Sequence, residues 1–138
     1  MPDAQLLTRG KRENVSIGTG VSIFLDGQNG AGDPKIWCGG DATLVVEIDM
    51  TGGAATDLSV EVNPYEADNA TVQLNQILPA AADPTGGGAG GAGLSEFVGG
   101  HCYLIAQYDV QGYEMVRVKI TNNNAGTQTL TRGSWRLQ

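Results

Sequence analysis

Few residues in this chain have the types and spacing that enzyme chemistry needs. His101 is the only histidine among 138 residues, so a nucleophilic triad would have to be built around it. It follows two glycines at the start of an apolar run, which favours a structural or solvent-facing role. Glu47, Asp49 and Glu61 alternate with apolar residues, so we expect them to face solvent and not to form the carboxylate pair of a glycoside hydrolase. The sequence therefore predicts no enzyme and no catalytic residue.

Zinc and phosphate sites are weakly supported as well. Cys38, His101 and Cys102 lack the close, paired ligand spacing of zinc sites. Residues 86–93 are six glycines and two alanines, but the Gly-Lys-Ser/Thr ending of a phosphate-binding loop is missing. Two cysteines make no disulfide framework, so we expect both to be reduced and buried, with a bridge between them as the less favoured alternative.

Calcium is the one metal that the sequence leaves open. Asp26, Asn29 and Asp33 lie in a glycine-rich loop and could offer oxygen ligands. The spacing is not that of an EF-hand, and Trp37 stands where the closing glutamate would be. Turn hydrogen bonds made by these side chains are the simpler interpretation. We therefore expect no metal and no cofactor.

The charge of the chain is negative and unevenly placed. A net charge of −7 argues against a nucleic-acid-binding surface. Residues 14–109 hold twelve carboxylates and one lysine, whereas residues 110–138 hold four cations and one glutamate. An acidic, well-solvated surface is the simpler interpretation. The sharper one is contact between the basic ends of one copy and the acidic middle of another.

Targeting signals are not evident in the sequence. No apolar run reaches the roughly 18 residues of a membrane span. Residues 1–14 lack the apolar segment and cleavage site of a signal peptide. We expect a protein that is made and kept in a cytoplasm and has no membrane partner.

Alternating apolar and polar residues predict several half-buried β-strands. The clearest alternation covers residues 43–50, 58–62 and 116–120. The inward residues of these strands should form the core: Val46, Ile48, Val60, Val118 and Ile120.

Further strands are expected at 21–25, 36–38, 71–78, 102–110 and 127–137. The segment 102–110 is apolar on both faces and should be central, whereas 127–137 should contain a β-bulge at Gly133. Residues 122–126 should form a hairpin turn of residues that tolerate positive φ. The fold class predicted is all-β: a single-domain antiparallel β-sandwich, jelly-roll-like, with about eight strands.

Two segments are expected to lie outside the sheets. Residues 1–13 are polar, without period, and contain Arg9, Lys11 and Arg12. We expect an extended N-terminal arm that orders on a neighbouring subunit through these three basic residues, a frayed terminus being the alternative. The sandwich domain would then be residues 14–138, with residues 79–96 as a Gly-rich mobile loop inside it.

The end of the chain resembles a known group of proteins. Residues 108–118 read YDVQGYEMVRV and residues 122–127 read NNNAGT. These segments are similar to the last hairpin of the small jelly-roll cement or decoration proteins of tailed-phage capsids. There an Asp-Val-x-Gly-Tyr turn enters a strand like VRVK, and an Asn-rich turn leads to a closing Thr-rich strand. The resemblance covers about the last quarter of the chain, and the Gly-rich stretch at 86–93 departs from the pattern.

The resemblance implies a homotrimer that clamps capsomers, with no enzyme activity and no cofactor. We therefore expect a virion structural protein, made in the host cytoplasm, that decorates a phage capsid surface by self-association and by binding the major capsid protein. A carbohydrate- or surface-binding sandwich module is the alternative. Aromatic residues are only 6% of the chain and are scattered, which disfavours a sugar-stacking face.

Overall fold

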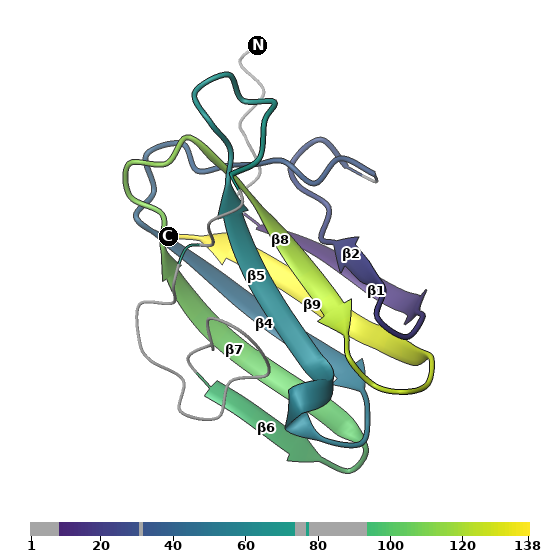
Figure 1. Ribbon diagram of the computed structural model, residues 1–138. Helices are drawn as coiled ribbons and strands as arrows, with labels where there is room; N and C mark the ends of the chain where they lie inside the picture. The colour runs from purple at the N-terminus through teal and green to yellow at the C-terminus, as the bar shows by residue number, and fades with distance from the viewer. Residues whose placement is uncertain (1–8, 31, 74–76, 78–93) are drawn as a thin grey trace.

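Two antiparallel sheets pack face to face in the computed structural model, which describes residues 9–30, 32–73, 77 and 94–138 (Figure 1). The five-stranded sheet has the order β1-β9-β4-β7-β6. Its strands are β1 (Arg9–Ile17), β4 (Thr43–Thr51), β6 (Leu94–Val98), β7 (His101–Asp109) and β9 (Gln128–Leu137). In the four-stranded sheet, β8 (Met115–Asn122) pairs with β5 (Leu58–Pro64), β2 (Ser22–Phe24) and β3 (Ile36–Trp37). A short 3-10 turn, Ala55–Asp57, precedes β5.

The connections follow the jelly-roll pattern. The chain crosses between the sheets at nearly every step, so that β1, β4, β7 and β9 lie in one sheet and β2, β5 and β8 in the other. This places β1-β9-β4-β7 opposite β2-β8-β5, as in a jelly roll, and β6 extends the first sheet by one strand. The predicted all-β sandwich is confirmed. In the part of the chain that the structure describes, no helix is long and apolar enough to cross a membrane.

The core lies between the two sheets and contains the residues that the alternating sequence pattern predicted to be buried. Val46, Ile48, Val60, Val118 and Ile120 are each at most 5% exposed. The largest fully buried side chains include Trp135 and Tyr108. The predicted strand at 71–78 contributes two isolated bridges, Tyr65 to Val72 and Val62 to Ile77; residues 74–76 and 78 lie outside the described residues.

The bulge in β9 lies two residues before its expected place. Asp49 pairs with Arg132 and Met50 with Leu130, so Thr131 is the extra residue opposite β4. Gly133 has a different role: a Cβ there would stand 2.7 Å from Cδ2 of Leu25. The glycine therefore leaves room for the buried side chain of Leu25, which directly follows β2.

Residues 9–13 form strand rather than the expected arm. They pair with residues 132–136 of β9, and β1 begins at Arg9, before residue 14 where the sandwich domain was expected to start. The physical reason is that this edge strand has few apolar residues of its own, so it has no visible alternation. Residues 1–8 of the expected arm lie outside the described residues. The same holds for residues 79–93 of the expected Gly-rich loop, whereas residues 94–96 belong to β6.

Candidate functional site

The face of the five-stranded sheet that points away from the core carries an exposed apolar patch. Strand β7 was expected to be apolar and covered on both faces, but its residues alternate between buried and exposed. Tyr103 is 40% exposed and Ile105 45%. Large exposed apolar side chains among the described residues are Val21, Phe97, Val98, Tyr103, Ile105 and Tyr113. Three of these six, Val98, Tyr103 and Ile105, lie on the outer face of the β6–β7 hairpin, whereas Phe97 pairs with the inward-facing Cys102. The patch is therefore local and not a general property of the surface.

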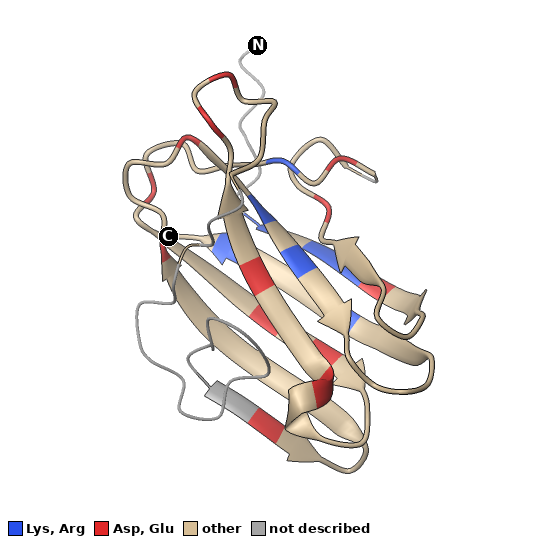
Figure 2. Ribbon diagram, viewed as in Figure 1, with Lys and Arg blue, Asp and Glu red and all other residues tan. Residues whose placement is uncertain are grey.

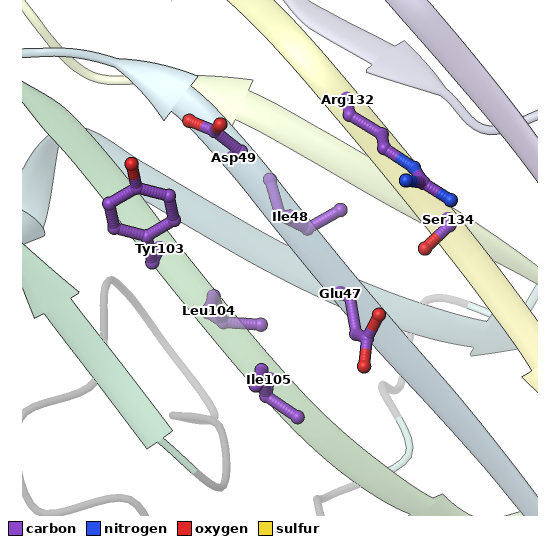
Figure 3. A pocket seen from close by; sticks show the side chains of 8 residues that line it. All are labelled: Glu47, Ile48, Asp49, Tyr103, Leu104, Ile105, Arg132 and Ser134. Atoms are coloured by element: carbon purple, nitrogen blue, oxygen red, sulfur yellow. The ribbon is translucent and has the colours of Figure 1, made fainter.

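A groove of about 290 Å³ runs beside this patch, across β7, β4 and β9 (Figure 3). Tyr103 and Ile105 border it on β7, Glu47 and Asp49 come from β4, and Arg132 and Ser134 come from β9. Strand pairing explains the arrangement, because Tyr103 is directly opposite Asp49, and Ile105 opposite Glu47. The groove thus combines an aromatic ring, carboxylates, a guanidinium and a hydroxyl.

His101 belongs to the same outer face. Its Nδ1 lies 2.6 Å from Oδ1 of Asp49, and its ring stacks on Tyr103 with centroids 5.8 Å apart. Cys102, the next residue, points to the inner face because successive side chains alternate, and its Sγ donates to the carbonyl oxygen of Ala54 at 3.0 Å. His101 and Cys102 are therefore kept apart by the strand, and they do not form a dyad. Nothing in the sequence indicates the contact with Asp49, which is 52 residues away.

Four cations form a basic strip on the outer face of β1 and β9: Arg9, Lys11, Arg132 and Arg136 (Figure 2). Together with Glu47 they line a second groove of about 360 Å³. Nη1 of Arg136 lies 3.1 Å from Oε1 of Glu47, and Nζ of Lys11 lies 3.1 Å from Oε1 of Glu13. Of the three arm residues predicted to make contacts, Arg9 and Lys11 belong to this strip. Arg12 points inward and donates to the carbonyl oxygen of Phe24 at 3.0 Å.

The loop that was left open as a calcium site uses its carboxylates within the loop. Oδ1 of Asp26 accepts from the N–H of Gly32 at 3.1 Å. Asp33 accepts from the N–H of Lys35 and from Nδ2 of Asn29, which lowers its pKa. The geometry is that of Asx turns. In the part of the chain that the structure describes, no group of three or more His, Cys, Asp or Glu residues is placed to hold a metal ion.

Comparisons with protein-family models, curated proteins and solved structures find no match for this chain. The functional interpretation therefore rests on the geometry of the outer face. Its two components are the basic strip and the apolar patch on the β6–β7 hairpin, which lie at opposite edges of one sheet.

Proposed function

We propose that this protein is a non-enzymatic structural component of a phage virion, which decorates the capsid by associating with copies of itself and with the major capsid protein. The observation that carries the proposal is the outer face of the five-stranded sheet. It combines exposed Tyr103 and Ile105 with a strip in which three of the four cations are arginine. Aromatic residues and arginine are enriched in protein–protein interfaces, and lysine is depleted.

The fold and the C-terminal segment support the same proposal. The hairpin expected at residues 122–126 is instead a connection between the sheets, because β8 and β9 belong to different sheets. The segment that resembles decoration proteins corresponds to β8 and the connections at both of its ends, in a sandwich with jelly-roll connectivity. Both features are structural, so they are compatible with the proposed role without requiring it.

A carbohydrate-binding role is the second candidate, and the groove in Figure 3 favours it. An exposed tyrosine ring can stack on a sugar. Glu47, Asp49 and Arg132 beside it can accept or donate hydrogen bonds to sugar hydroxyls.

The test uses capsids assembled from the major capsid protein of the same genome and prepared without this chain. Full-length protein should cosediment with these shells, saturate at a fixed ratio, and raise the temperature at which the shells open. Protein that stays in the supernatant at every salt concentration would contradict the proposal. Retention on a glycan array in that case would support the second candidate.

A further inference from the structure

We infer that the outer side of the β6–β7 hairpin of one copy binds the basic strip on β1 and β9 of a second copy. The inference rests on the proposed function in one respect, since it takes the chain to associate with itself. It goes beyond that function by naming the two surfaces of the chain that contact each other.

The β6–β7 hairpin has the composition of an interface centre with an acidic rim. Tyr103 lies between two carboxylates, because it pairs with Asp49 on β4 and with Glu96 on β6. Ile105 and Val98 on the same face are 45% and 52% exposed. Within the described residues, β6 is also the last strand of its sheet, and a sheet edge offers unpaired backbone groups to another chain.

The basic strip is complementary to that hairpin, and among the described residues only two of its four cations are paired within their own copy: Lys11 with Glu13 and Arg136 with Glu47. Arg9 lies directly opposite Arg136 in the β1–β9 register, and like charges at such positions destabilise a sheet. An acidic partner would remove this repulsion. Among the described residues, the ion pair between Arg136 and Glu47 is the one contact that joins the strip to a carboxylate of β4.

Most of the two surfaces are too far apart to contact each other within one copy; the exception is Asp49, which lies directly opposite Arg132 in the register of β4 and β9. The two surfaces face the same way, and strands in a sheet are about 4.8 Å apart. Strand β9 is therefore about 10 Å from β7, and β1 is about 19 Å from β6, beyond the Debye length of about 8 Å in physiological salt. Between copies, the guanidinium groups can contact Glu96 and can stack over the exposed ring of Tyr103.

The contact joins two different surfaces, so it is heterologous. Such a contact leads to a closed ring when the rotation between copies closes, and to an open chain when it does not. Each copy then uses both edges of the same sheet.

The test is sedimentation velocity of the full-length chain without shells, over a range of protein and salt concentrations. The wild type should associate at low salt, and its dissociation constant should rise as salt increases. Tyr103→Ala should raise that constant about tenfold or more, as loss of a central interface tyrosine does. Tyr113→Ala is the matched control, because Tyr113 is 39% exposed but lies in the loop before β8; it should change the constant less than about twofold. Ile105→Ser repeats the test, with Val21→Ser, at 47% exposure, as its control.

A mixing experiment then tests the pairing of the two surfaces. Arg9→Glu should stay folded, because it replaces the repulsion between residues 9 and 136 by attraction. It should abolish association between copies. It retains an intact hairpin, whereas Tyr103→Ala retains an intact strip. At a concentration at which each variant alone sediments as a monomer, an equimolar mixture of the two should form heterodimers. Circular dichroism and urea midpoints confirm that each variant is folded.

Three results would overturn the inference: a wild type that is monomeric at every concentration, patch variants that associate as the wild type does, or a mixture that stays monomeric. These results are distinct from failure of the proposed function. A monomeric chain that still binds shells would reject the inference and the self-association, but would leave the binding to capsids in place. An oligomer built through these surfaces that does not bind shells would reject the capsid role alone.

Discussion

Gly10 of β1 lies against the indole ring of Trp135 on the paired strand β9, so close that a Cβ at residue 10 would stand 2.6 Å from Nε1. The ring cannot move aside easily. It is 1% exposed, and its N–H donates to the carbonyl oxygen of Asp26 at 2.7 Å. The edge strand thus covers the largest side chain of the core, which ties residues 9–17 to the stability of the domain.

Gly10→Ala should therefore lower the free energy of unfolding by about 1–3 kcal/mol, the usual cost of overpacking. Urea denaturation measures it. Gly126→Ala serves as the control, because its nearest atom is Oδ1 of Asn124 at an ordinary 3.5 Å, and it should change stability by less than about 0.5 kcal/mol. Equal effects of the two variants would contradict the close contact between β1 and Trp135.

Ile48→Ala should destabilise the protein by about 2–5 kcal/mol, because Ile48 is 3% exposed and packs in the core. Ile105→Ala removes the same atoms from a neighbouring strand at a position that is 45% exposed. It should stay within about 0.5 kcal/mol of the wild type. Both are measured by urea denaturation at high salt, where association of copies is weakened. A larger loss for Ile105→Ala would mean that the register of β7 is reversed.

The sequence predicted the parts of the fold that depend on local alternation and missed those that depend on strand neighbours. Strand β4 alternates because one face is core and the other is solvent, which is visible in a single segment. Strand β1 is different: its inward residues include Gly10 and Arg12, which lie over Trp135 and beside Phe24. Nothing within residues 9–13 could reveal these partners.

The candidate site was less predictable for the same reason. Tyr103 and Ile105 look like core residues in a run of apolar letters, and only the side of β7 on which they lie makes them surface residues. Their proximity to Arg132 depends on the strand order β9-β4-β7, which joins segments from three separate parts of the chain. Arg9, Lys11 and Arg12 were expected to make contacts from an extended arm, but all three belong to β1, and Arg12 faces inward.

Asn122→Ala should lower the free energy of unfolding by about 2–4 kcal/mol, since it removes two donated hydrogen bonds, one of them to the carbonyl oxygen of the buried Ile17. The turn after β8 was expected to depend on positive φ, but none of residues 122–126 has it. The side chains hold it instead: Nδ2 of Asn122 donates to the carbonyl oxygens of Ile17 and Gly126, both at 2.9 Å, and its Oδ1 accepts from the N–H of Asn124. Asn123→Ala, at an exposed position, should lower the free energy of unfolding clearly less. Thermal unfolding of both variants measures the difference. A larger loss for Asn123→Ala would argue against this account of the turn.

Acid should weaken the fold in part through Asp68. The backbone N–H groups of Thr71 and Ala70, and the hydroxyl of Thr71, donate to its carboxylate and lower its pKa from 3.8 to about 2. A carboxyl whose pKa is lower in the folded state stabilises the fold above its unfolded pKa, and this stabilisation is lost as pH falls toward the folded value. Asp68→Asn should therefore show a smaller drop in melting temperature between about pH 4 and pH 2 than the wild type. Identical slopes would show that the hydrogen bonds of Asp68 do not favour its ionised form in solution.

Cys38 and Cys102 should be unreactive until the protein unfolds. Both are free and buried, and burial raises the pKa of each thiol to about 11, with Asp41 adding to the effect at Cys38 and Asp57 at Cys102. At pH 8 only about 0.1% of each would be thiolate, the form that reacts. They also lie toward opposite ends of β4, since the N–H of Asp41 donates to the carbonyl oxygen of Cys38 whereas Cys102 pairs with Met50.

That separation is about 20 Å along a strand, whereas a disulfide needs Cα atoms within about 7 Å. A thiol-specific chromogenic reagent should therefore label no cysteine of the native chain and two cysteines per chain in denaturant, before and after exposure to an oxidant. Cys38→Ser and Cys102→Ser, each retaining one thiol, should show the same protection of the remaining cysteine. One thiol that reacts rapidly in the native protein would show that its end of the sandwich opens, and loss of both thiols on oxidation would show that the two ends of β4 are not held apart.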